Sequence, residues 1–193
     1  MDLKGKKLIL ASNSPRRREL LAGLDVNFTV DAHTRFMEKF SPDTPHEIVP
    51  VLMSEGKSEG FHRPLEKDEI LITADTMVLC GDQILGKPKS HADEVRMLKL
   101  LSGREHHVIT AVTLRDRERH VTETDTSTVW FKDLDDEEID YYLRRYHPHD
   151  KAGSYGIQEW IGYIGISRIE GSYFNIMGLP VHLLYGMLKD FIG

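Results

Sequence analysis

Short apolar runs alternate along this chain of 193 residues with stretches in which apolar residues recur every three or four positions. The runs predict buried strands and the three-to-four spacing predicts amphipathic helices. We expect strands over Lys7–Ala11, Glu69–Cys80, Gln83–Leu85, Val108–Leu114, Val121–Phe131 and Ile164–Tyr173. We expect helices over Pro15–Ala22, Thr44–Gly60, Ala92–Leu101 and Asp135–Arg145, and a last helix from Pro180. This mixture indicates an α/β or α+β fold with a mixed sheet.

Several expected helices carry residues that favour the start or the end of a helix. Ser14 is a suitable N-cap, Pro15 suits the first helical position, and Gly23 follows the last turn of that helix. Acidic residues fill the first turn of the Asp135–Arg145 helix and arginines fill its last, which complements the helix dipole. The segment His147–Tyr163 is rich in glycine, histidine and aromatic residues, and we expect it to form a loop.

Length and composition are those of one ordinary globular domain, residues 1–193, or of one domain with two lobes. Cys80 is the single cysteine, so no internal disulfide can form, which suits a reducing compartment. The apolar run Leu8–Ala11 is too short for a secretory signal, and no run approaches the ~18 apolar residues of a membrane span. We therefore expect a cytoplasmic protein with no membrane partner.

The formal net charge of −6 limits the class of ligand. Binding to nucleic acid depends largely on neutralising phosphates with lysine and arginine, so an acidic chain is a poor general nucleic-acid binder. We expect no nucleic-acid partner. Any phosphate group must then be bound by a local cluster of basic residues.

Arg16 and Arg17 belong to a run of three arginines in the first turn of the expected N-terminal helix. Cations oppose the helix dipole there, by about 0.3–1 kcal/mol each, whereas the free backbone N–H groups favour an anion. A polyphosphate would compensate the clustered positive charge, and the hydroxyls of Ser12 and Ser14 would add donors. The alternative is a solvated basic face that pairs with Glu19.

Asp75 and Thr76 lie inside the apolar run that predicts the strand Glu69–Cys80. An unpaired carboxylate inside such a strand is costly, so Asp75 is a candidate to hold Mg²⁺ or to activate a water. The alternative is an aspartate that caps a loop or pairs with an arginine. Lys87 follows in a Gly-Lys-Pro sequence, which restricts the backbone around this cation. A phosphate-binding lysine is one interpretation, and a lysine in a plain surface turn is the alternative.

The segment Asp150–Gln158 is the third candidate site. Gly153 and Gly156 indicate a close approach of the backbone or a positive φ. The amide of Gln158 both donates and accepts hydrogen bonds, so it is able to read the edge of a base. A plain surface loop is the alternative.

Two pairs of neighbouring histidines invite a metal-binding interpretation, His106 with His107 and His147 with His149. Neither pair has the spacing or the partner ligands of a zinc site. We therefore expect no transition metal at these pairs.

Taken together, these segments resemble the Maf family of nucleotide pyrophosphatases. The matching stretches are LILASNSPRRRELL from Leu8, ITADTMV from Ile72, GKP from Gly86, DKAGSYGIQ from Asp150 and IEGSYFNIMGLP from Ile169. Their order and spacing match over nearly the whole chain. The resemblance implies a two-lobed α/β fold, a mixed sheet flanked by helices with a central cleft, similar to inosine triphosphate pyrophosphatases. It also implies hydrolysis of nucleoside triphosphates to monophosphate and pyrophosphate, a divalent cation (Mg²⁺ or Mn²⁺) and often a homodimer.

The resemblance also implies roles for single residues. Asp75 matches the family's proton acceptor, which helps a water to attack the α-phosphorus directly or through the metal. Lys57 and Lys87 match lysines that neutralise charge on the triphosphate. The substrate-binding positions expected from the segments and the resemblance together are Ser12, Ser14, Arg16, Arg17, Thr76, Asp150, Lys151 and Gln158.

Three positions separate two branches of the family by substrate. The branch of dTTP/UTP pyrophosphatases carries Arg, Thr and Gln there, and the branch of 7-methyl-GTP pyrophosphatases carries Trp, Gln and Glu. This chain has Arg16, Thr76 and Gln158, so it resembles the first branch. A glutamine amide suits the neutral edge of uracil or thymine, whereas tryptophan and glutamate suit a cationic methylated purine.

The chain departs from the family pattern at three places, one of which is Ser58, where alanine is usual. The usual Val-Asp-Glu after the first helix, whose glutamate contributes to the site, is absent, and either Asp31 or Glu38 would substitute for it. Glu159 and Trp160 replace the usual small residues after Gln158, which places bulk beside the expected base pocket.

Two other functions stay open at this point. A non-catalytic regulator of cell division or septum formation would bind a nucleotide without turnover, although the intact Asp75, Lys57 and Lys87 favour catalysis. A nucleotidyltransferase should have a glycine-rich loop near the N-terminus, where this chain has Ser-Asn-Ser-Pro.

Overall fold

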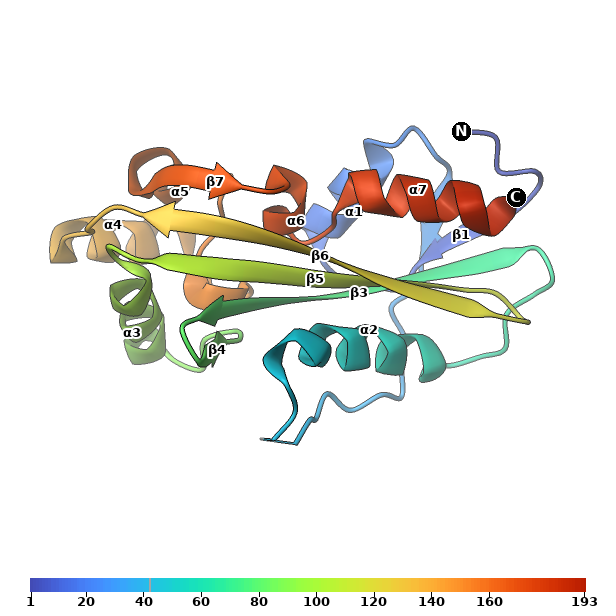
Figure 1. Cartoon of the computed structure of the whole chain (residues 1–193), viewed down its shortest axis with the longest axis horizontal. Coiled ribbons are helices and arrows are strands. Elements are labelled where there is room, and N and C mark those ends of the chain that lie inside the picture. Colours follow the sequence, from blue (N-terminus) through green and yellow to red (C-terminus); the bar gives the residue numbers. More distant parts are fainter. Residues whose placement is uncertain (42) are drawn as a thin grey trace. The chain divides into compact units, whose positions relative to one another are not determined.

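The computed structural model describes residues 1–41 and 43–193. In this part of the chain seven strands form one sheet and seven α-helices accompany it (Figure 1). The strands are β1 (Lys7–Leu10), β2 (Phe28–Val30), β3 (Glu69–Cys80), β4 (Gln83–Leu85), β5 (Glu105–Arg115), β6 (His120–Phe131) and β7 (Ile166–Glu170). The helices are α1 (Pro15–Ala22), α2 (Val49–Glu59), α3 (His91–Leu101), α4 (Asp136–Tyr146), α5 (Trp160–Gly165), α6 (Tyr173–Met177) and α7 (Val181–Ile192), with 3₁₀ turns η1 (His46–Ile48) and η2 (Ala152–Ser154).

The sheet is mixed, with the strand order β2-β1-β3-β5-β6-β7 and β4 paired to β3. β1 pairs in parallel with both β2 and β3, whereas β4 pairs antiparallel with β3 and β7 antiparallel with β6. This confirms the expected α/β class with a mixed sheet. No helix among the described residues is long and apolar enough to cross a membrane.

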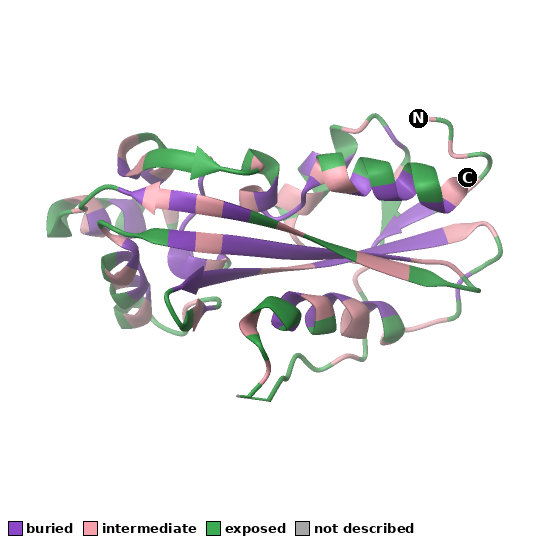
Figure 2. Cartoon of the chain, in the orientation of Figure 1, coloured by how far each residue is buried: buried purple, intermediate pink, exposed green. Residues whose placement is uncertain are grey.

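The chain divides into two compact units. Unit 1 comprises Met1–Thr76, Thr110–Asp125 and Gly178–Gly193, and unit 2 comprises Met77–Ile109 and Thr126–Met177. The long strands β3, β5 and β6 each contribute residues to both units. Figure 2 shows that buried positions follow these strands, while the outer faces of the helices are exposed.

In unit 1, α1 and α7 lie on one face of the sheet and α2 lies on the other (Figure 1). α7 buries Leu184 and Leu188 completely, and α1 buries Leu21. The contact of α2 with the sheet is partly polar, because the buried Ser54 hydroxyl lies 2.8 Å from the Thr113 hydroxyl. Polar groups taken out of water need such partners, so these hydroxyls fix where α2 sits.

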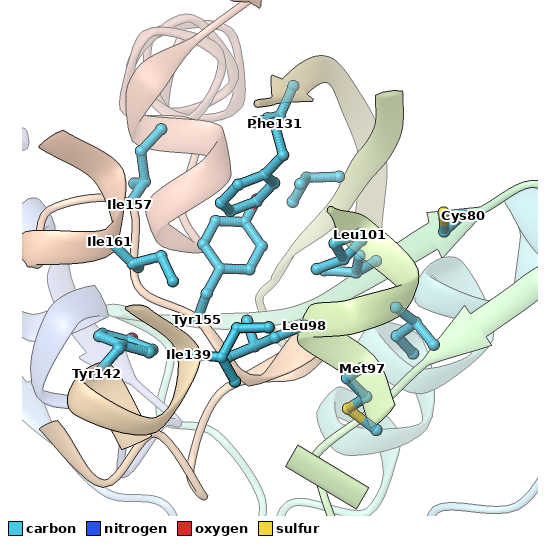
Figure 3. Close-up of a cluster of buried hydrophobic side chains, with 14 of the residues drawn as sticks. Cys80, Met97, Leu98, Leu101, Phe131, Ile139, Tyr142, Tyr155, Ile157 and Ile161 are labelled. Carbon is cyan, nitrogen blue, oxygen red and sulfur yellow. The ribbon is translucent and has the colours of Figure 1, made fainter. Parts of the chain in front are cut away.

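Unit 2 is built around an apolar core that α3, α4 and the segment after α4 enclose. Phe131, Tyr155, Leu98 and Ile139 point toward one another in this core (Figure 3). The rings of Phe131 and Tyr155 meet edge to face, with centroids 5.1 Å apart. This arrangement is favoured for aromatic pairs and gives the core a definite geometry.

Most of the long elements were predicted well, whereas several short ones were not. β3 and β4 have the expected bounds, and α1 has the expected N-cap Ser14. The expected loop 147–163 instead contains η2 and the start of α5, the strand expected over 164–173 is only five residues long, and β2 and α6 were not expected. The unexpected β2 and α6 have three and five residues, too few to show a periodicity, and contacts with the rest of the fold determine them.

We expect Leu98→Ala to destabilise the protein strongly, because the Leu98 side chain is fully buried in the core of unit 2. Removing a buried leucine side chain costs about 2–5 kcal/mol through lost burial and the cavity that remains. The free energy of unfolding in urea measures the effect. Leu52→Ala is the matched control, since Leu52 is 41% exposed and its truncation should cost less than about 1 kcal/mol. Equal losses in the two variants would contradict this description of the core.

Candidate functional site

Asp75 and Thr76 interrupt the burial of β3. The neighbouring positions on this strand are buried, but these two side chains are partly exposed. A carboxylate inside a sheet requires a charged or hydrogen-bonding partner. The partners of these two residues define the candidate site in unit 1.

Lys57 is the charged partner of Asp75. It lies in the last turn of α2, and its Nζ is 2.6 Å from Asp75 Oδ1 and 2.9 Å from Glu38 Oε1. Lys57 and Asp75 are 17% and 19% exposed, so solvent screens this pair only partly. One ammonium group thus lies between two carboxylates, and Asp75 pairs with a lysine rather than with the arginine considered above.

Glu38, not Asp31, reaches Lys57. The segment that carries Glu38 lies against α2, because Gly56 and Gly60 leave room for the Phe36 side chain. A Cβ atom on Gly56 would come within 2.3 Å of the Phe36 ring. The backbone N–H of Arg35 also donates to Gly60 O at 2.7 Å. This packing between distant segments brings Glu38 to the lysine.

The N-terminus of α1 is organised by two serines. Ser14 is its N-cap, and its hydroxyl accepts a hydrogen bond from the Arg17 N–H at 3.4 Å. The buried Ser12 hydroxyl accepts one from the Ser14 N–H at 3.2 Å. Each hydroxyl keeps its own proton to donate. This first turn therefore presents hydroxyl donors together with the half-buried Arg16.

Arg17 has a more structural place than the sequence suggested. Its Nη1 donates to Ala74 O at 2.8 Å, its Nη2 to Thr76 Oγ1 at 3.0 Å, and its Nε to Gly178 O at 2.8 Å. Burial lowers the pKa of Arg17, and the charge of Asp75 opposes that effect. Three of the five guanidinium N–H groups thus have protein acceptors, so Arg17 positions Thr76. Thr76 Oγ1 also lies 2.9 Å from Thr110 Oγ1.

In unit 2, the buried Lys151 is enclosed by carboxylates. Its Nζ lies 2.8 Å from Asp150 Oδ1 and 3.1 Å from Glu159 Oε1. The Tyr142 hydroxyl donates to Glu159, and burial together with that carboxylate raises the pKa of Tyr142. Glu159, which the sequence suggested as bulk beside a base pocket, is therefore directed toward Lys151. A Cβ on Gly156 would come within 2.8 Å of the Glu159 carboxyl group, so a larger residue there would displace the Glu159 side chain.

Gln158 is the unsatisfied member of this group in unit 2. Its Oε1 is buried and has no hydrogen-bond partner in the described part of the chain. Buried acceptors are normally paired, so an orphaned one is a candidate ligand contact. Lys87 is exposed in the turn after β4, and the neighbouring Gly86 accepts a hydrogen bond at 3.2 Å from the Gly153 N–H.

The neighbouring histidines have other surroundings. His106 is buried against Tyr155, with 2.7 Å between Nε2 and the hydroxyl oxygen, and burial lowers its pKa to about 3. His107 Nδ1 lies 3.1 Å from Thr128 Oγ1. His147 ends α4 in the left-handed conformation, with φ of 48°.

One group that the sequence analysis missed comprises Asp31, His33 and His62. One possible metal-ligating atom from each lies within 4.8 Å of the others. Only the Asp-Ala-His spacing hinted at this group, because His62 lies on the far side of α2 in the sequence.

Comparisons with known proteins cover nearly the whole chain. A family model described as "Maf-like protein" matches residues 7–191. A protein of Porphyromonas gingivalis strain W83 named dTTP/UTP pyrophosphatase is 50% identical over 192 residues, which cover 98% of this chain and 96% of that protein. Proteins with the same name from Parabacteroides distasonis and Bacteroides thetaiotaomicron are each 46% identical, over 190 and 188 residues; the matches cover 98% and 97% of this chain and the same shares of those proteins.

We expect Arg17→Lys to lower stability, because one ammonium group cannot reach the three acceptors that the planar guanidinium contacts. Leaving buried acceptors without donors costs about 1–3 kcal/mol. The free energy of unfolding in urea measures the loss. Arg18→Lys is the matched control on the same helix, since Arg18 is exposed. An Arg17→Lys variant as stable as Arg18→Lys would contradict the positioning role.

Proposed function

The chain belongs to the Maf-like protein family, and we propose that it is an enzyme that hydrolyses nucleoside triphosphates, dTTP and UTP in particular, to the monophosphate and pyrophosphate. Relatives 43% to 50% identical along nearly the full chain are named dTTP/UTP pyrophosphatase, which supports this substrate class. The structural observation that carries the proposal is the Lys57 ammonium between the carboxylates of Asp75 and Glu38.

The two carboxylates fit a hard divalent cation. Mg²⁺ and Mn²⁺ prefer oxygen ligands and are commonly held by one or two carboxylates together with phosphate oxygens. We propose that Asp75 and Glu38 supply these ligands, with Glu38 in the part that other family members give to a glutamate after the first helix. The bound cation would polarise the phosphates and stabilise the leaving pyrophosphate.

The residues of unit 1 have complementary tasks in the proposed reaction. Asp75 accepts a proton from the water that attacks the α-phosphorus, and Lys57 orients the Asp75 carboxylate and neutralises charge on the triphosphate. Ser12, Ser14 and Arg16 bind phosphate oxygens at the N-terminus of α1, where the helix dipole also favours an anion. We assign Arg17 to the placement of Thr76, one of the three positions that mark the substrate branch.

In unit 2, we propose that Gln158 reads the base. Uracil and thymine carry an N–H donor at N3, which would satisfy the buried Gln158 Oε1. Lys151 and Asp150 belong to the same loop and complete this substrate-binding segment, in which Glu159 and Tyr142 hold the lysine in place. Lys87, which is exposed, neutralises charge on the triphosphate.

Four further features belong to the same proposal. Residues 1–193 form a single Maf-like domain, and its fold is of the inosine triphosphate pyrophosphatase type. The enzyme acts in the cytoplasm. It forms a homodimer, for which the exposed aromatic side chains Tyr173 and Phe174 of α6 offer apolar surface.

We expect the protein to release pyrophosphate from dTTP and UTP with Mg²⁺ or Mn²⁺, and Asp75→Asn to lower kcat by about 10²–10⁴-fold because the proton acceptor and a metal ligand are lost. Direct detection of pyrophosphate over a panel of nucleoside triphosphates measures both. Asp82→Asn is the control, since Asp82 is exposed in the turn after β3.

Three outcomes of this panel would change the proposal. Preference for 7-methyl-GTP would keep the reaction but contradict the branch assignment. Binding of triphosphates without any turnover would favour the non-catalytic regulator of cell division. Full activity of Asp75→Asn would contradict the assignment of the proton acceptor.

We expect Gln158→Leu to lower kcat/KM for UTP about tenfold or more, because the N3 donor of the base would lose its acceptor. The change for CTP should be smaller, since cytosine carries no hydrogen at N3. The UTP to CTP ratio of kcat/KM measures the effect. Gln83→Leu is the control, because Gln83 is the other glutamine of the chain and is exposed. An unchanged ratio in Gln158→Leu would contradict base reading by this residue.

A further inference from the structure

A second cluster of polar side chains lies in unit 1 beyond the end of β2. Asp31 directly follows this strand, and its N–H donates to Leu10 O at 3.1 Å. An isolated antiparallel bridge joins Thr34 to Phe61, and the N–H of His62 donates to His33 O at 3.3 Å. This short pairing places the two histidines beside each other, with ring centroids 5.4 Å apart.

The three side chains converge on one point. His33 Nδ1 lies 2.8 Å from Asp31 Oδ1, and His62 Nε2 lies 2.9 Å from Asp31 Oδ2. One possible metal-ligating atom from each residue lies within 4.8 Å of the other two. Two ligands at a tetrahedral zinc ion lie about 3.3 Å apart, as metal–ligand bonds of about 2.0–2.1 Å require. Small side-chain rotations would therefore place the three atoms around one ion.

We propose that Asp31, His33 and His62 form a binding site for a divalent transition-metal ion, zinc(II) by its donor set, in addition to the site of Lys57, Asp75 and Glu38. Two imidazole nitrogens and a carboxylate oxygen are frequent zinc ligands, and a water would fill the fourth position. The donor set differs in kind from the oxygen ligands that Mg²⁺ prefers.

The charges around the cluster suit a cation. The Asp31 carboxylate places negative charge beside both imidazole nitrogens, 2.8 Å from His33 Nδ1 and 2.9 Å from His62 Nε2. The neighbouring Arg63 contacts the Glu69 carboxylate with both terminal nitrogens, at 2.7 and 2.9 Å. The positive charge of Arg63 is therefore balanced by another acid.

A bound ion would join two distant parts of the chain. His33 lies at the start of the segment that leads to Glu38, and His62 follows the helix that ends near Lys57. Linking residues 33 and 62 restricts the chain between them, and binding to the folded form alone stabilises it. The ion would thus hold in place the start of the segment that carries Glu38.

Titration of tag-free protein with Co²⁺, a spectroscopic substitute for Zn²⁺, tests the site. We expect one ion per chain at the cluster, with the visible absorption of four-coordinate Co²⁺ and displacement by Zn²⁺. The same signal should appear in Asp75→Asn, which separates this site from the proposed catalytic metal. It should also appear in His120→Ala, a control that removes an exposed histidine elsewhere in unit 1.

The double variant His33→Ala/His62→Ala should lose the absorption, and its affinity for Zn²⁺ should fall about 100-fold or more, since even loss of a residue that only orients a ligand costs 10–100-fold. Zn²⁺ should raise the Tm of the parent protein but not that of the double variant. The His33 side chain is 84% exposed and the His62 side chain is 36% exposed, so the double variant should fold. Unchanged Co²⁺ binding in the double variant, or no stoichiometric binding by the parent protein, would overturn the proposal. Neither result depends on turnover of a nucleotide.

Discussion

The ion pair between Lys57 and Asp75 compensates for a carboxylate placed inside a sheet. β3 is otherwise buried along its middle, and a free aspartate there would be strongly unfavourable. The partner comes from the last turn of α2, so the helix has to be held against the sheet at a fixed depth. The buried hydroxyls of Ser54 and Thr113 provide that attachment, 2.8 Å apart. The position of one polar residue thus constrains a helix and the strand next to it.

A similar requirement operates at the neutral hydroxyl of Thr76. Its hydroxyl is met by Arg17 from α1 and by Thr110 from β5, so three segments far apart in the sequence meet at one oxygen atom. The guanidinium also binds the carbonyl of Ala74 on the same strand. Each of these hydrogen bonds satisfies a polar group that would otherwise be buried without a partner. Loss of one hydrogen bond therefore leaves the remaining groups poorly placed. This interdependence fixes the position of the Thr76 side chain.

The sequence predicted features that depend on neighbouring residues and missed those that depend on distant ones. Ser14 before Pro15 is a local signal for a helix start, and the structure confirms it. The choice between Asp31 and Glu38 could not be made, because Glu38 reaches Lys57 only through packing of its segment on α2. His33 and His62 likewise come together through one antiparallel bridge, which no spacing rule indicates. The motif residues can be named from the sequence, whereas the contacts that orient them are visible only in the folded chain.

The ligand types in unit 1 argue for a division between two kinds of cation. Asp75 and Glu38 offer carboxylate oxygens around a lysine that can turn to a phosphate group, which suits a cation bound weakly and together with its substrate. Asp31 with His33 and His62 offers two nitrogens and one oxygen with no polyphosphate needed, which suits a resident ion. Zinc would compete with magnesium for the oxygen site, since carboxylate oxygens are ligands of both ions. A nearby site richer in nitrogen would bind zinc first and so leave the carboxylates to the harder cation.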